Sequence, residues 1–210
     1  VRSIGNARGI HIGGYEANPA DITVSRSVFA GNVKAAVRII VAPGLQECTM
    51  TGCNISGNLS AGIRTDDYDG DDAVIRFESC VIAGNGYDFF SGEGTQGVGI
   101  EGGRPYFINN TVAWNRSNGY YSVPPYPYGG DEDVANNIFI HNGGRGFVNY
   151  QELPSRFSHN LFRENDDGEL RIEALVVEDS HGSLASSEFV NVAVAMVGIG
   201  QDVLSLPVEL

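Results

Sequence analysis

A short motif that ends in asparagine recurs along the chain and constrains its fold more than any other feature. The motif has the form small–x–apolar–x–x–Asn, as in SVFAGN, CVIAGN and NLFREN. With the incomplete first and last copies included, the asparagines of the motif are Asn6, Asn32, Asn58, Asn85, Asn115, Asn142, Asn165 and Asn191. Successive asparagines are 26, 26, 27, 30, 27, 23 and 26 residues apart. A period of this size predicts a solenoid whose coils carry loop insertions.

The pattern within each repeat favours strands over helices. Apolar residues alternate with others, as at Val37 and Ile39, which is the period of a strand. A small residue and then an apolar one follow most of the asparagines, in the pairs Gly9-Ile10, Ala36-Val37, Gly62-Ile63, Gly99-Ile100, Gly119-Tyr120 and Gly146-Phe147, with Glu169-Leu170 as the exception. We expect an all-β fold: a single right-handed parallel β-helix of about eight coils, with stacked asparagines at one turn and glycines where a Cβ has no room.

This repeat resembles that of the right-handed parallel β-helix family, the pectate-lyase-like superfamily, over roughly residues 6–191. The resemblance implies the fold but leaves the function open, because the same fold carries lyases, hydrolases, epimerases, adhesins and phage spikes. The carboxylate motifs of polygalacturonases and the lysine column of some lyases have no match. We expect residues 1–191 to form the β-helix and the apolar segment 192–210 to be a cap, or a contact with another subunit or domain.

Charge and length exclude several partners. The net charge is -13, the pI is about 4.5 and Lys34 is the only lysine, so nucleic acid and anionic membrane surfaces are poor partners. No apolar run approaches about 18 residues, so no membrane insertion is expected. Four asparagines begin N-glycosylation sequons: Asn54, Asn58, Asn109 and Asn115. Glycans at turn asparagines would disrupt the asparagine stack. We therefore expect an extracellular or cell-surface protein of prokaryotic or viral source.

The three cysteines do not indicate the redox compartment of the protein. Cys53 and Cys80 occupy the same motif position in successive repeats, and Cys48 is left over. Stacked strands bring their Cα atoms within bridging range, but parallel side chains give an awkward disulfide geometry. We favour free, buried thiols.

An acidic loop is the sharpest local feature. Five carboxylates surround one glycine within seven residues, at Asp66, Asp67, Asp69, Asp71 and Asp72. Ca²⁺ prefers six to eight oxygen ligands, and such a loop can supply several of them, although the spacing is not that of an EF-hand. We expect Ca²⁺ as the cofactor, and the alternative is a solvated acidic loop.

A basic stripe is predicted on the outward face of one sheet. One residue beyond the apolar column stand His11, Arg38 and Arg64, followed in our alignment by Glu101 and Tyr121. Such a stripe could neutralise a uronate carboxylate and hold a base for β-elimination, which makes His11, Arg38, Arg64 and Tyr121 the catalytic candidates. The alternative is that the two arginines pair with nearby aspartates.

A tyrosine-rich loop with three prolines offers contact surface for sugars or for protein. Together with Glu101, its expected ligand-binding residues are Tyr120, Tyr121, Tyr126 and Tyr128, and the single tryptophan, Trp114, can join them from a turn position that is glycine in other repeats. A loop packed on itself is the alternative.

Two functions remain open from the sequence. The first is an extracellular structural or surface module that adheres, forms fibres or contacts glycans, with a polysaccharide or further copies of itself, stacked end to end, as the partner. The second is a calcium-dependent lyase or related enzyme acting on acidic polysaccharide. The missing catalytic motifs favour the first.

Overall fold

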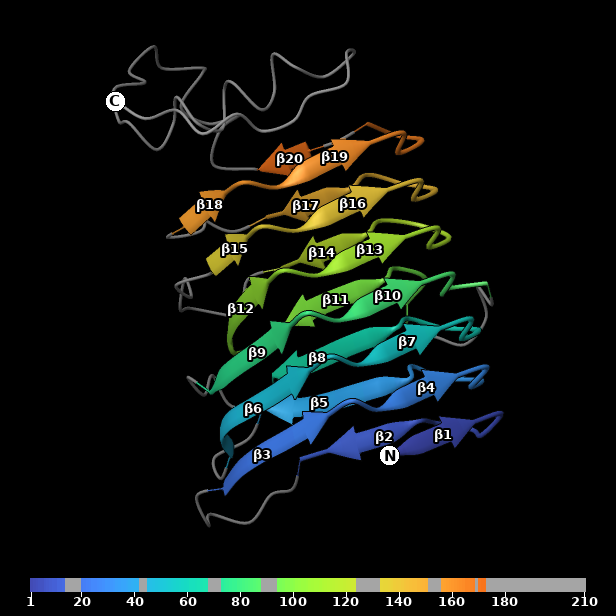
Figure 1. The fold of residues 1–210 in the computed structure, drawn as a ribbon, viewed down its shortest axis with the longest axis vertical. Helices are drawn as coiled ribbons and strands as arrows, with labels where there is room; N and C mark the ends of the chain where they lie inside the picture. Colours follow the sequence, from blue (N-terminus) through green and yellow to red (C-terminus); the bar gives the residue numbers. More distant parts are fainter. Residues whose placement is uncertain are drawn as a thin grey trace.

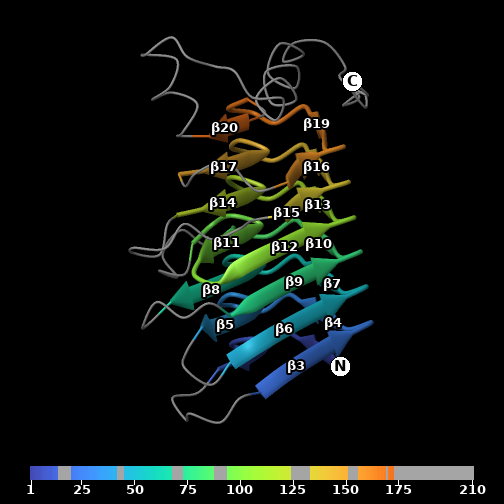
Figure 2. The same cartoon turned by 90° about the vertical axis from the view of Figure 1, so that its left-hand side faces the viewer.

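A computed structural model describes residues 1–13, 20–41, 45–67, 73–87, 94–123, 133–150, 156–168 and 170–172. Within these ranges the chain is built from strands and turns, and it coils so that each strand pairs in parallel with its counterpart in the next coil (Figure 1). Three sheets run along the coil axis, as the view turned by 90° also shows (Figure 2). Within these ranges there is no helix long and apolar enough to cross a membrane.

The three sheets are named here A, B and C. Sheet A consists of β1 (Arg2–Ile4), β4 (Val28–Ala30), β7 (Asn54–Ser56), β10 (Val81–Ala83), β13 (Thr111–Ala113), β16 (Ile138–Ile140) and β19 (Leu161–Arg163). Sheet B consists of β2 (Ile10–Ile12), β5 (Val37–Val41), β8 (Ile63–Asp67), β11 (Val98–Glu101), β14 (Tyr120–Ser122), β17 (Phe147–Asn149) and β20 (Leu170–Ile172). Sheet C consists of β3 (Ala20–Ser25), β6 (Leu45–Thr51), β9 (Val74–Glu78), β12 (Arg104–Ile108), β15 (Asp133–Ala135) and β18 (Arg156–Ser158).

The predicted all-β parallel solenoid is therefore confirmed, with fewer coils in the described residues than the eight or so expected. Two sheets have seven strands and the third has six. The predicted repeat that ends at Asn191 and the segment 192–210 lie outside the described residues.

The predicted asparagine stack is confirmed as a continuous ladder between sheets A and B. The side-chain amide of Asn58 donates to Oδ1 of Asn85 at 2.8 Å, and that of Asn85 donates to Oδ1 of Asn115 at 3.0 Å. Each Oδ1 also accepts the backbone N–H of the preceding ladder residue, as between Asn58 and Asn85 at 3.1 Å. The ladder runs through Asn32, Asn58, Asn85, Asn115, Asn142 and Asn165. Buried amides are thus satisfied by their counterparts one coil away.

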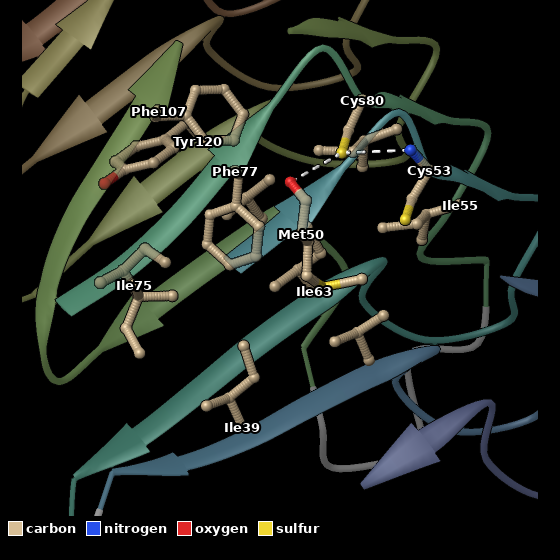
Figure 3. Packing of buried hydrophobic residues seen from close by; sticks show 14 of the residues in the cluster. Ile39, Met50, Cys53, Ile55, Ile63, Ile75, Phe77, Cys80, Phe107 and Tyr120 are labelled. Atoms are coloured by element: carbon tan, nitrogen blue, oxygen red, sulfur yellow. Dashed lines mark hydrogen bonds between the residues drawn. The ribbon is translucent and has the colours of Figure 1, made fainter. Parts of the chain in front are cut away.

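A second ladder lies at the turn between sheets C and A. Asn110 donates to Asn137 and Asn137 to Asn160, at 3.1 Å and 2.9 Å. Cys80 and Cys53 continue this file: Cys80 N–H donates to Oδ1 of Asn110, and Cys53 N–H donates to Sγ of Cys80 at 3.4 Å (Figure 3). All three cysteines are buried free thiols, as predicted.

The core consists of files of apolar side chains, one from each coil. Phe29, Ile55, Ile82, Val112 and Phe139 lie in register on sheet A and are fully buried. Aromatic rings fill the core where files from different sheets meet, and Figure 3 shows Phe77, Phe107 and Tyr120 in one cluster. Each coil therefore buries its apolar residues against the next, as a solenoid requires.

The register of sheet B differs from our alignment in one coil. Val98, not Ile100, pairs with Ile63 and with Tyr120, so the small residue before the column is Gly97. A Cβ on Gly97 would lie 2.6 Å from Nδ2 of Asn115, and this close approach to the ladder explains the glycine. Glu101 therefore pairs with Asp66. The position beside Arg64, at which our alignment had placed Glu101, is occupied by Gly99.

Candidate binding face on sheet B

The outer face of sheet B carries the predicted basic stripe. His11 pairs with Arg38, and Arg38 pairs with Arg64, so the three side chains come from adjacent strands. Their neighbours along each strand, such as Val37 and Ile39, are fully buried in the core. Strand alternation therefore directs the stripe outward, as the sequence predicts.

Arg38 and Arg64 are joined by a buried carboxylate. Asp66 is 6% exposed, its Oδ2 accepts from Nε of Arg38 at 2.6 Å, and its Oδ1 accepts from Nε of Arg64 at 2.7 Å. Arg64 Nη2 also contacts Oε2 of Glu101 at 3.1 Å. Charge-assisted bonds of this length fix the guanidinium groups in place. The alternative in which the arginines pair with nearby aspartates thus holds for Asp66.

Two tyrosines and an arginine follow on the same face: Tyr121 in β14, Tyr150 directly after β17 and Arg171 in β20. Gly99 separates them from Arg64, because its outward position carries no side chain and Gln96 lies over it. The rings of Tyr121 and Tyr150 meet edge to face at 5.6 Å, and the Arg171 guanidinium lies 4.9 Å from the Tyr150 ring centre. Aromatic and cation–π contacts of this kind hold side chains together at a partly exposed surface.

The pKa of Tyr121 is raised by burial first, and then by the neighbouring Tyr150 and Glu101, against the opposing effect of Arg171. The phenol of Tyr121 is therefore protonated at neutral pH, where it can donate a hydrogen bond.

Several predicted ligand-binding residues lie elsewhere. Tyr120 is fully buried and its ring stacks on Phe147 at 4.7 Å, so its assignment as contact surface is corrected: it occupies the inward apolar column. Trp114 lies at the turn after sheet A, as its glycine counterparts predicted, and not on the sheet B face. Tyr126 and Tyr128 lie outside the described residues.

The acidic loop is only partly described. Asp66 and Asp67 end β8, whereas Asp69, Asp71 and Asp72 lie outside the described residues. Both Asp66 oxygens are held by arginines, which oppose a cation at that carboxylate. No group of three or more potential metal ligands occurs among the residues that the structure describes. A calcium site in this loop would have to use the other four aspartates.

Tyr150 and Arg171 were not among the residues chosen from the sequence as candidates. Both stand at outward positions of the repeat register, so the alignment that gave the stripe could have identified them. The signal was weak because four other tyrosines, Tyr120, Tyr121, Tyr126 and Tyr128, lie close together in the sequence and drew the prediction to that segment. The pairing of strands is what brings Tyr150 and Arg171 together.

Comparison with known proteins places the repeat in a family. The family model described as "Right handed beta helix region" matches residues 8–189. No curated protein matches the chain, and no solved structure does.

Proposed function

The chain belongs to the right-handed β-helix family, and from this premise we propose that it is an extracellular β-helical module that binds acidic polysaccharide along the outer face of sheet B. The observation that carries the proposal is the Tyr121–Tyr150 pair with Arg171 against it, on the same face as Arg38 and Arg64. Tyrosine rings provide apolar surface for the C–H face of a sugar, and guanidinium groups provide paired donors for a uronate carboxylate.

The local charge supports an acidic ligand. Among the described outward side chains of sheet B, three arginines (Arg38, Arg64 and Arg171) stand with only two carboxylates (Asp66 and Glu101). The whole chain carries a net charge of -13, so this face is an exception on an acidic rod. A polyanion approaching the rod is repelled by most of its surface and attracted here.

Binding is better supported than cleavage. A β-elimination needs a group that accepts a proton at the working pH. The pKa of Tyr121 is raised, and both oxygens of Asp66 are engaged by arginines. The calcium-dependent lyase is the alternative, with His11 as the remaining candidate base and Ca²⁺ from the acidic loop.

Calorimetric titration with a short oligogalacturonide tests the proposal, with its methyl-esterified form as the uncharged comparison. Tyr150→Ala and Arg171→Gln should each weaken binding about tenfold, equivalent to about 1.4 kcal/mol. The matched controls are Tyr106→Ala and Arg76→Gln, because Arg76 lies 4.1 Å from the Tyr106 ring centre on sheet C. Affinity should also fall as salt rises.

Equal losses in both pairs of variants, or equal affinity for the charged and esterified ligands, would contradict a uronate site on sheet B. Release of unsaturated sugars that absorb in the ultraviolet would favour the lyase.

A further inference from the structure

The turn between sheets A and B carries another group of exposed side chains, separate from the face of sheet B. The residue before each ladder asparagine has a positive φ in every coil that the structure describes, and the first four are glycines: Gly5, Gly31, Gly57 and Gly84. In the next three coils the same position holds Trp114, His141 and Glu164, with φ of 52°, 53° and 54°. Residues with a Cβ adopt this conformation less readily than glycine. It also recurs before the second ladder, so it is a feature of the repeat's turns, at Arg26, Ser79, Asn109, Asn136 and His159.

These three side chains form a stack along the coil axis. The indole of Trp114 lies parallel to the imidazole of His141, with ring centres 5.8 Å apart and planes inclined by 10°. Nδ1 of His141 lies 3.1 Å from Oε2 of Glu164, whose Oε1 accepts from Nε of Arg163 at 2.9 Å. The contacts with Glu164 and Arg163 fix the imidazole, and the imidazole supports one face of the indole.

The other face of the indole is turned away from His141, and the preceding coil has Gly84 at this position. Among the described residues, a Cβ on Gly84 would meet a single neighbour within 4 Å, the backbone nitrogen of Gly57 at 3.9 Å, and a Cβ on Gly57 would meet none. Trp114 is 59% exposed. Among the residues that the structure describes, the stack of side chains therefore ends at Trp114, and glycines hold the same position in the preceding coils. The turns that follow the strands of sheet A line the right-hand edge of Figure 1.

We propose that this face of Trp114 is a stacking platform for one pyranose ring of an oligosaccharide, which occupies the space over Gly84. Successive coils are about 4.8 Å apart, a spacing that suits a ring stacked on the indole as a further member of the column. The site uses no residue of the sheet B face and therefore does not depend on the function proposed for that face.

The surroundings favour a sugar over an apolar segment of protein. Tyr87 is 57% exposed three residues after Gly84, and Arg116 is exposed two residues after Trp114. The backbone N–H of Arg116 donates to the carbonyl of Asn85, which places the two turn segments side by side. A pyranose offers a C–H face for the indole and a rim of hydroxyl groups for these polar side chains.

Fluorescence gives a direct test, because Trp114 is the only tryptophan. The full chain is titrated with cellohexaose, mannohexaose and a short oligogalacturonide. At least one should change the tryptophan emission in a saturable way at millimolar concentration or below. Trp114→Phe, which keeps a smaller ring, should retain weak binding by calorimetry, and Trp114→Ala should abolish it at this site.

Gly84→Asn is the decisive variant, because it fills the space over the turn and leaves Trp114 in place. Asparagine accepts this backbone conformation, as Asn109 and Asn136 do at φ of 59° and 57°. Gly31→Asn is the matched control, since a Cβ on Gly31 also meets only one backbone nitrogen, at 3.9 Å, but lies far from Trp114 along the column. We expect Gly84→Asn to weaken the fluorescence response at least tenfold and Gly31→Asn to leave it unchanged.

Several results would overturn the proposal. These are no emission change with any of the three sugars, an equal effect of the two glycine variants, or self-association that Trp114→Ala abolishes while sugar binding persists. Tyr150→Ala separates the two sites: it should weaken oligogalacturonide binding to sheet B and leave the Gly84-dependent fluorescence response intact.

Discussion

Each ladder asparagine satisfies polar groups in two neighbouring coils. Asn85 accepts from the backbone and the side-chain amide of Asn58, and it donates to Asn115 and to the carbonyl of Ile55. The sequence predicted this ladder because one residue type recurs in it. The second ladder was not predicted, because its members differ in residue type and share only a small polar side chain that donates to a backbone carbonyl, as Ser27, Cys53, Cys80 and Asn110 do.

Asn85→Ala should lower the free energy of unfolding by about 3 kcal/mol, since several buried amide groups lose their partners together. Asn54→Ala, at an exposed position of β7, should change it by no more than about 0.5 kcal/mol. Urea unfolding followed by circular dichroism measures both. A similar small change in the two variants would show that the ladder contributes little.

We predict that the buried thiol of Cys48 makes the free energy of unfolding fall at alkaline pH. Burial, and then the charge of Glu47, raises the pKa of its thiol from 9.0 to about 12. The folded state therefore keeps the proton that the unfolded state loses, and the contribution to stability is lost as pH rises from about 9 to 12. Cys48→Ala should flatten the fall in unfolding free energy across this window by up to about 1.4 kcal/mol for each pH unit. An unchanged slope would mean that another group is responsible.

At the scale of the strands, small residues allow the ladder to approach sheet B. A Cβ would lie too close to a ladder amide nitrogen at three of these positions: 2.9 Å away at Gly62, 2.6 Å at Gly97 and 2.9 Å at Gly119. The sequence predicted this column but shifted it by two residues in one coil. Val98 and Ile100 are both apolar, so a period of two does not determine which of them begins the strand's inward file.

Gly119→Ala tests this packing. The added Cβ would lie 2.6 Å from the carbonyl oxygen of Gly146 and 2.9 Å from Nδ2 of Asn142. We expect a loss of about 1–3 kcal/mol, as for other overpacked sites, with a fall in melting temperature. Gly57→Asn, where a Cβ meets no described residue within 4 Å, should cost less. The reverse order would contradict the close approach.

At the scale of the whole molecule, the repeat determines the fold, but the site depends on which residues face outward. The stripe of His11, Arg38 and Arg64 could be predicted because strand alternation is regular there. Tyr120 could not be interpreted correctly from its tyrosine-rich neighbourhood, since its place in the apolar column decides its burial. Local composition and repeat register disagreed at this residue, and the register was right.

The calcium proposal concerns a loop of which the structure describes only the beginning. With Asp66 held by arginines, we expect Asp69→Asn and Asp71→Asn to reduce the rise in melting temperature that millimolar Ca²⁺ produces over a chelator. Asp166→Asn, an exposed acid in a turn, is the control. If Ca²⁺ causes no shift in the unchanged protein, the loop is a solvated acidic segment.

The location of the polysaccharide site is the central claim, and nuclear magnetic resonance tests it most directly. An oligogalacturonide is titrated into protein labelled at tyrosine rings and arginine side chains. We predict saturable shift changes at Tyr121, Tyr150 and Arg171, smaller changes at Arg64, and none at Tyr106 or Arg76 on sheet C. Changes centred on sheet C, or no changes at millimolar ligand, would contradict a binding face on sheet B.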